Sequence, residues 1–184
     1  MDLFQTLPQL RQFPFLRHKT VALIGVSTII SDEAAYYFEI AKPKYWRHPQ
    51  PGEVDRCTRI GVGGIGGSIE KDEEVLVCLH REVEEELGVR VRPEMSPVTY
   101  LIRDWQIIDQ LSFAPGKKQP VPLMVNLTPP RLGGPHIPDR LAIVTFRATL
   151  RGAPAPGDLF GLLRVEKTAL AAFFARDAWS LDDL

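Results

Sequence analysis

Residues 67–89 read GSIEKDEEVLVCLHREVEEELGV, and their second half is a predicted helix with an unusual distribution of charge. Glu82, Glu85 and Glu86 are spaced i, i+3 and i+4, so the helix places their carboxylates on one side. Like charges at these spacings cost about 0.2–0.5 kcal/mol per pair, and the carbonyl end of a helix also disfavours negative charge. A helix selected only for stability would avoid this pattern. A divalent cation held by the carboxylates would resolve the conflict.

The apolar residues of this segment predict how the helix packs. Four of them recur at helical spacing and form one stripe toward the core: Leu76, Leu79, Val83 and Leu87. On a helical wheel Glu86 lies beside this stripe, which places the acidic cluster at the edge of the core rather than on a fully solvated face. Asp72 is the predicted N-cap of the helix, and Gly88 suits the left-handed position that ends it.

A second motif directly precedes this stretch. Residues 61–66 read GVGGIG and fit G-x-G-x-x-G, the dinucleotide-binding fingerprint. That fingerprint requires a helix to begin at the glycines, so that its N-terminus meets the pyrophosphate. Here the helical pattern begins several residues later, near Val75, and the region about twenty residues on is predicted helix instead of a strand ending in an acid. We therefore reject a dinucleotide-binding fold.

The complete pattern is G-x5-E-x7-R-E-U-x-E-E-x-G-U, where U is aliphatic, and all nine specified positions match from Gly67 to Val89. It resembles the Nudix box, the signature of the Nudix hydrolases. The resemblance implies an α+β fold, a Nudix-type α/β/α sandwich with a mixed sheet, a catalytic loop and helix, and a C-terminal helix. One departure is Ile65, where many members have proline before the glycine pair. It leaves the implied metal ligands unchanged but gives no subfamily.

The resemblance also implies the chemistry. Family members use Mg²⁺, for which Mn²⁺ can substitute, and a water attacks a phosphorus of a diphosphate linked to another group. The implied catalytic residues are Glu82, Glu85, Glu86, Arg81 and Glu73. The implied metal ligands are Glu82, Glu85, Glu86, Glu70 and Gly66. Glu73 and Arg81 are predicted to pair and to hold the loop against the helix. Which carboxylate takes the proton stays open.

Residues outside the box are candidates for binding the rest of the substrate, a nucleotide-type small molecule. They are Arg59, Arg47, Arg103, Trp105 and Arg140, with Arg131 and His136 as further candidates. Residues 42–59 form a basic loop that leads into the glycines, and this loop is either merely solvated or faces phosphates. Trp105 either stacks on a base or packs within the protein. The box contacts the diphosphate and not the attached group, so the substrate stays open.

Two other functions are known for proteins that share this fold and all or part of the box. A prenyl diphosphate isomerase has the same fold and a partial box, but it needs a catalytic cysteine and motifs that neither Cys57 nor Cys78 matches. A non-catalytic Nudix domain that senses a ligand commonly loses box glutamates, and none is lost here. The prediction is therefore a pyrophosphohydrolase.

Composition fits a single domain of 184 residues, predicted to be cytoplasmic. Apolar residues make up 45% and charged residues 24%, and the net charge of −1 argues against an extended nucleic-acid surface. Two cysteines make no disulfide framework and favour a reducing compartment. The apolar run 21–30 follows basic residues like a signal peptide, but it lacks a cleavage site and is too short to cross a bilayer. No membrane association is predicted, and a homodimer is compatible with the resemblance.

The rest of the chain reads as strands and loops around the box. Residues 1–19 are predicted to be a peripheral cover on the core, because Pro8 and Pro14 limit any helix to short pieces. The predicted strands are 20–30 and 34–41, paired as an antiparallel hairpin, followed by 58–62, 89–92, 98–103, 123–127, 140–150 and 159–165. Residues 114–140 are rich in proline and glycine and read as a long loop, and residues 166–175 as a C-terminal helix.

Overall fold

The computed structural model describes residues 1–50, 52, 57–114, 120–130 and 137–175. Within these residues the helices are α1 (Leu3–Thr6), η1 (Pro8–Gln12), η2 (Pro14–Leu16), η3 (Pro43–Tyr45), α2 (Val75–Leu87) and α3 (Leu170–Phe174), where η marks a 3-10 helix. The strands are β1 (Val21–Ser31), β2 (Ala35–Ile40), β3 (Val62–Gly63), β4 (Ile65–Ser68), β5 (Arg90–Glu94), β6 (Val98–Arg103), β7 (Gln106–Ser112), β8 (Met124–Thr128), β9 (Arg140–Arg151) and β10 (Gly161–Glu166). None of the helices in these ranges is long and apolar enough to cross a membrane.

The described strands form one mixed sheet of ten strands in the order β10-β2-β1-β9-β8-β6-β7, with β3 beside β2, β4 beside β1 and β5 beside β9. At its centre β1 and β9 run parallel, from the pair Val21 and Arg140 to the pair Ser31 and Thr149. β6 and β8 are also parallel, whereas hairpins such as β1–β2 and β6–β7 are antiparallel. This mixed sheet confirms the predicted α+β fold.

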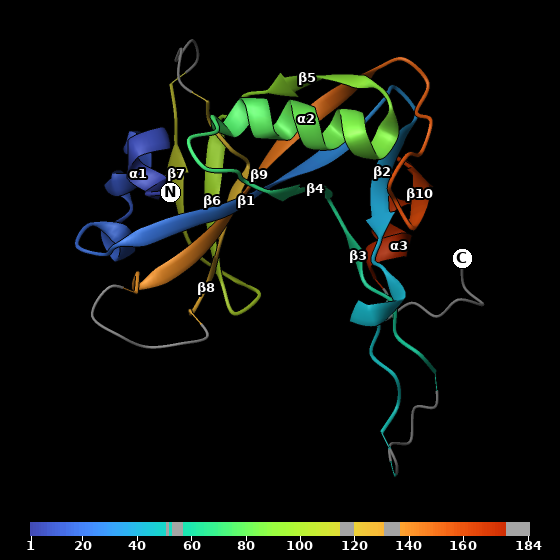
Figure 1. Ribbon diagram of the computed structural model, residues 1–184, viewed down its shortest axis with the longest axis horizontal. Coiled ribbons are helices and arrows are strands. Elements are labelled where there is room, and N and C mark those ends of the chain that lie inside the picture. Colours follow the sequence, from blue (N-terminus) through green and yellow to red (C-terminus); the bar gives the residue numbers. More distant parts are fainter. Residues whose placement is uncertain (51, 53–56, 115–119, 131–136, 176–184) are drawn as a thin grey trace.

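Helices cover both faces of the sheet. α2 lies across one face, where it packs on β4, β5 and β1 (Figure 1). Successive residues of β2 point to opposite faces. Tyr37 joins the core under α2, whereas Phe38 packs on the other side against Phe173 of α3, with the two ring centres 6.4 Å apart. Helix α2 therefore covers one face of the sheet, and α3 covers the other.

The C-terminal helix is shorter than the predicted range of residues 166–175. α3 begins at Leu170, because Glu166 still belongs to β10 and pairs with Ala35 of β2. The Lys167 N–H then donates to the Ala34 carbonyl at 2.8 Å, which continues the contact with β2. Pairing with the neighbouring strand thus delays the start of the helix.

The first 19 residues, predicted to be a peripheral cover on the core, contribute apolar side chains to that core. Five of their apolar side chains are completely buried: Leu3, Leu7, Leu10, Phe13 and Leu16. The prolines do divide the segment into short helices, as predicted, but a spacing of three or four residues keeps the apolar side chains on one side. The segment is also tied to the sheet, because the Leu23 N–H donates to the Met1 carbonyl at 2.8 Å.

The antiparallel hairpin predicted near the N-terminus is confirmed by β1 and β2. Asp32 closes the turn, since its Oδ1 accepts the N–H groups of Ala34 and Ala35 at 2.8 and 2.7 Å. Its Oδ2 accepts the Tyr37 hydroxyl at 2.6 Å, and this bond is the main reason why the pKa of Asp32 is lowered. The turn thereby fixes β2, the strand that faces the last turn of α2.

Five of the other predicted strands are present: β6 has the predicted bounds, and the ends of β5, β8, β9 and β10 are shifted by one or two residues. Residues 58–62 are the exception, because only Val62 belongs to a named strand and Arg59 forms an isolated bridge with Arg47. β7, at Gln106–Ser112, is a further strand that none of the predicted ranges covers. The loop predicted at 114–140 contains β8, and its segments 115–119 and 131–136 lie outside the described residues.

Candidate active site

Helix α2 carries the acidic cluster and packs on the sheet through its apolar side. Its buried residues are Val75, Cys78, Leu79, Val83 and Leu87. Leu76, predicted for the same stripe, is only half-buried but still packs against the core. The helix ends as predicted at Gly88, which has a φ of 61° and donates its N–H to the Glu84 carbonyl at 2.9 Å.

Asp72 is not the N-cap of α2, so that prediction is wrong. The residue before the helix is Glu74, and its side chain makes no capping bond. Asp72 lies two residues earlier in the left-handed region, with a φ of 62°. The turn is closed instead by Glu73, whose Oε2 accepts the N–H of Glu70 at 2.9 Å. Glu73 also binds Arg81, so the helix itself fixes the loop.

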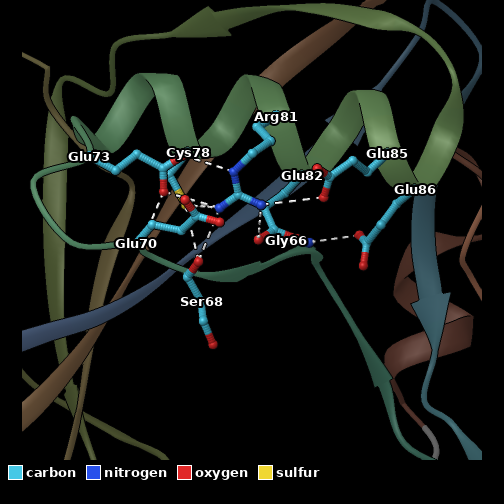
Figure 2. A network of polar contacts seen from close by, with 9 residues as sticks. All are labelled: Gly66, Ser68, Glu70, Glu73, Cys78, Arg81, Glu82, Glu85 and Glu86. Carbon is cyan, nitrogen blue, oxygen red and sulfur yellow. Dashed lines mark hydrogen bonds and ion pairs between the residues drawn. The ribbon is translucent and has the colours of Figure 1, made fainter.

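Arg81 lies at the centre of the polar network shown in Figure 2. Its Nε and Nη2 donate to the two carboxylate oxygens of Glu73 at 2.8 and 3.0 Å, which confirms the predicted pair. Its Nη1 donates to Glu82 at 2.8 Å and to Glu85 at 3.3 Å, and Nη2 also reaches the Ser68 carbonyl at 3.2 Å. One guanidinium thus joins the loop, β4 and the helix, and it offsets the charges of two box glutamates.

Glu73 is expected to contribute stability that disappears in acid. The hydrogen bond from Arg81 is the main cause that lowers the pKa of Glu73 to about 2. A lowered pKa in the folded state means that this contribution is complete above about pH 4.5 and is lost as the pH falls through about 2. Urea unfolding of the wild type and Glu73→Gln, from neutral pH downward, measures it. The stability difference between the two proteins should shrink in acid, and a difference independent of pH would contradict the assignment.

Glycines in β4 allow β1 and the glutamates of α2 to approach the strand closely. A Cβ on Gly66, whose φ is 155°, would lie 2.2 Å from the carbonyl oxygen of Val26 in β1. A Cβ on Gly67 would lie 2.3 Å from Glu82 Oε2. The Gly66 N–H donates to Glu86 Oε2 at 3.1 Å (Figure 2). Without side chains at these positions, the strand backbone and the box glutamates come into direct contact.

Gly66→Ala is expected to lower the free energy of unfolding by about 2 kcal/mol, because the new methyl group would overlap a backbone oxygen that cannot rotate away. Gly63→Ala is the matched control, since a Cβ there would meet nothing within 4 Å. Urea unfolding of both variants checks the prediction. Equal stabilities of the two variants would show that the close approach at Gly66 does not constrain the fold.

The three box glutamates differ in their surroundings. The side chains of Glu82 and Glu85 are 13% and 54% exposed, and both contact Arg81. Glu86 lies at the edge of the core, as predicted, and burial raises its pKa to about 7, with the charges of Glu39 and Glu82 adding to the rise. Glu39 belongs to β2, and burial raises its pKa as well. Sequence reasoning missed Glu39, because nothing in the local pattern of β2 distinguishes it.

The oxygen donors of the box suit a hard cation such as Mg²⁺. In the structure Glu82 and Glu85 accept hydrogen bonds from Arg81, and Glu86 accepts the N–H of Gly66. Within the described residues no group of three or more acidic, histidine or cysteine side chains is positioned to hold an ion. Glu86 nevertheless fits a cation, because a positive charge would stabilise the ionised form that burial disfavours. Glu70 is exposed in the loop before α2.

The candidate substrate residues of the basic loop lie side by side. Arg47 and Arg59 face each other in an antiparallel bridge, in which each N–H donates to the other residue's carbonyl at 2.9 Å. Both residues are exposed. The described segments that join β2 to β3 project away from α2 (Figure 1). Whether this loop binds phosphates stays a prediction.

Arg140 is remote from the acidic cluster. It begins β9 and pairs with Val21 at the start of β1. Gly66 pairs with Ser27, six residues further along β1, which corresponds to about 20 Å at about 3.3 Å per residue. Arg131 and His136, the further candidates, lie outside the described residues. The structure therefore does not bring Arg140 to the box glutamates.

Arg103 and Trp105 lie at the turn between β6 and β7. The Arg103 guanidinium is 5.1 Å from the centre of the Phe15 ring and 3.5 Å from Asp104 Oδ2. Asp104 and Trp105 both have positive φ, as in a two-residue hairpin turn. Trp105 is 92% exposed, so the packing role considered for it is wrong. Stacking of Trp105 on a base stays a prediction.

Comparison with known proteins agrees with this geometry. The family model of the NUDIX domain matches residues 41–159, more than half of the chain. The chain belongs to the Nudix hydrolase family. Its loop, helix and glycine-rich strand are therefore the Nudix box of a pyrophosphohydrolase. No curated protein sequence matches the chain.

The comparison with solved structures gives matches of low sequence identity, and the three described below all have TM-scores under 0.5. A Nudix-family hydrolase from Clostridium perfringens is 16% identical, with 82% of this chain and 83% of that chain covered and a TM-score of 0.49. The MutT protein of Bacillus halodurans is 16% identical, with coverages of 82% and 71% and a TM-score of 0.40. The ORF135 protein of E. coli is 15% identical, with coverages of 78% and 74% and a TM-score of 0.42.

The state of Cys78 argues against the isomerase alternative. This residue is completely buried in α2, and burial raises the pKa of its thiol to about 12. A catalytic cysteine acts as a thiolate that substrate can reach, and Cys78 is neither ionised near neutral pH nor accessible. Its position in the helix is a packing position.

Proposed function

We propose that this Nudix hydrolase uses Mg²⁺ to cleave a diphosphate bond in a nucleotide-type small molecule. The observation that supports the proposal best is the intact loop and helix of the box. The Glu73–Arg81 pair fixes the loop, and Glu82, Glu85 and Glu86 extend from one side of α2 toward β4 (Figure 2). A domain that only binds its ligand would not require all three glutamates in this arrangement.

Each residue of the box has a part in the proposed reaction. When bound, the cation lowers the pKa of the attacking water and neutralises charge on the transferring phosphoryl group. Glu82, Glu85 and Glu86 would hold it, with Glu70 and Gly66 as the further ligands that the family pattern suggests. One of the three box glutamates would accept the proton of the attacking water. Arg81 keeps Glu82 and Glu85 oriented, since it donates to both.

A screen for turnover tests the proposal. Nucleoside triphosphates, nucleotide sugars, dinucleotides and coenzyme A are incubated with the protein and Mg²⁺ or Mn²⁺, and released phosphate or mononucleotide is measured. We expect one class to be hydrolysed, with the activity lost on chelation of the metal and strongly reduced in Glu86→Gln. Binding of a panel member without turnover under any condition would favour the alternative, a non-catalytic ligand-binding Nudix domain.

A cytoplasmic location is also part of the proposal. It is supported by the cysteine content, because two cysteines in 184 residues make no disulfide framework, as expected in a reducing compartment.

A further inference from the structure

Two aromatic side chains, Trp46 and Phe160, meet at the point where the basic loop leaves β2, and we call them the aromatic pair. The Nε1–H of Trp46 donates to the Ala41 carbonyl at 2.6 Å, and the two rings stand edge to face with their centres 5.5 Å apart. Phe160 is nevertheless 50% exposed. The pair is thus a fixed aromatic surface that solvent reaches.

The aromatic pair lies close to the end of the box helix. The Gly157 N–H donates to the Glu86 carbonyl in the last turn of α2 at 2.8 Å. Phe160 follows Gly157 by three residues, and a chain of three residues spans at most about 11 Å. Leu159 and Leu162, on either side of Phe160, pack against the core that α2 covers. The route from the acidic cluster to the aromatic pair is therefore short.

A glycine-rich stretch joins the same two places. Ala41 accepts the indole N–H and donates its own N–H to the Gly61 carbonyl at 2.9 Å. From Gly61 the chain runs through Gly63 to Gly66, whose N–H binds Glu86. A Cβ on Gly63 would meet nothing within 4 Å, so no neighbouring atom fills the space beside it. The aromatic pair and the acidic cluster thus lie at the two ends of one glycine-rich stretch.

Trp105, the other aromatic candidate for contact with a base, is further from the box. The box glycines of β4 pair with β1. In the sheet β10 is the second strand from β1 on one side, and β7 is the fourth on the other side. At about 4.8 Å between neighbouring strands, these positions are about 10 and about 19 Å from β1. Phe160 directly precedes β10 and Trp105 directly precedes β7, so the aromatic pair is the nearer of the two.

We propose that the aromatic pair is the subsite for the planar base of the substrate whose diphosphate is bound at the box. The inference rests on the proposed function, because it concerns the group attached to that diphosphate, and it narrows the substrate to a compound with an aromatic base. Every base has a flat face that stacks on an aromatic side chain, so the pair would accept different bases. Diphosphates that carry only aliphatic groups would gain nothing from it.

Two uncleavable probes test the inference on the full chain with Mg²⁺. α,β-Methylene-ADP carries a base and methylenediphosphonate does not, so the wild type should bind the first more tightly in calorimetric titrations. Phe160→Ala should weaken binding of α,β-methylene-ADP about tenfold, the scale at which loss of a stacking side chain acts, and leave the Kd of methylenediphosphonate unchanged. Phe160→Tyr keeps a ring and should bind both probes like the wild type.

The matched control is Phe174→Ala. Phe174 is 57% exposed and stands edge to face with Phe38 at a centre distance of 5.5 Å, so it resembles Phe160 in exposure and contact. It belongs to α3, however, which covers the other face of the sheet. Phe174→Ala should therefore bind both probes like the wild type.

Tryptophan fluorescence identifies the ring that the base contacts. α,β-Methylene-ADP should change the fluorescence of Trp105→Phe as it changes that of the wild type. The change should be largely lost in Trp46→Phe. The reverse pattern would assign the base to Trp105 and overturn the subsite.

Three binding results would also overturn the subsite. They are a wild type that does not prefer α,β-methylene-ADP, an unchanged Kd of this probe in Phe160→Ala, and an equal loss of affinity for both probes in that variant, which is the sign of a structural role. Each leaves the proposed function standing when the screen finds turnover that stops on chelation of the metal. A wild type that binds neither probe and turns over no compound of the screen would overturn both.

Discussion

Glu85→Gln is expected to lower kcat by about a hundredfold or more while leaving the fold intact, the scale at which loss of an acid–base or charge-stabilising group acts. Glu85 is more than half exposed, and its contact with Arg81 is the longest of the three ion pairs that Arg81 makes with glutamates in the described residues. Its removal therefore costs little stability. Metal affinity should fall with activity, because the glutamine lacks the charge that a divalent cation requires.

The matched control for this variant is Glu84→Gln. Glu84 is exposed on the same helix and occupies an unspecified position of the box. The two variants make the same charge change one residue apart, so they should share a melting temperature and differ only in turnover and Mg²⁺ affinity. Circular dichroism and steady-state kinetics on the substrate found by the screen make the comparison. Full turnover by Glu85→Gln would sink the assignment of a hydrolytic metal site.

Arg81→Ala is expected to destabilise the protein by about 3 kcal/mol, because it leaves the carboxylate of Glu73 largely buried without its partner. The same substitution removes the cation between Glu82 and Glu85, so repulsion along α2 adds to the loss. Arg81→Lys should recover part of the stability only. A lysine keeps the charge but cannot make the two-pronged contact with Glu73.

Urea unfolding near neutral pH, with and without Mg²⁺, measures this effect. Arg92→Ala serves as the control, since it removes an exposed arginine from β5 and should change the stability by less than about 0.5 kcal/mol. Added Mg²⁺ should restore part of the stability lost in Arg81→Ala, because it would offset the same carboxylates. A loss of stability no larger than that of the control would show that Arg81 does not hold the loop and helix together.

The box could be predicted in detail because its information is local. The helical spacing of the apolar residues and the glycine at the end define α2, and the pair of Glu73 with Arg81 follows from residues eight positions apart. The hairpin of β1 and β2 could also be predicted from the sequence, since two apolar runs flank a short polar turn. The prediction of Asp72 as the N-cap was wrong, because the contact of Glu73 with Arg81 decides how the loop enters the helix.

Features that depend on distant parts of the chain could not be predicted. The charge of Glu39 in β2 acts on Glu86 of α2 only because the fold brings distant parts of the chain together, an arrangement that no local pattern in β2 indicates. The depth to which Leu10 or Phe13 is buried depends on the core that the sheet provides, and not on the prolines that shorten the helices. Trp105 could not be assigned to the core or the surface from its apolarity alone, and its exposure follows from a two-residue turn.

The family match begins at residue 41, after β1 and β2 have ended. β1 lies between β2 and β9 and also pairs with β4, so a fragment cut at the limits of the match would lose the strand that supports the box glycines. It would also lose the N-terminal side chains that fill the core. The segment that the family model matches is therefore shorter than the part of the chain that must fold together. A truncation series should lose cooperative unfolding as soon as deletions pass residue 3, because Leu3 is already completely buried.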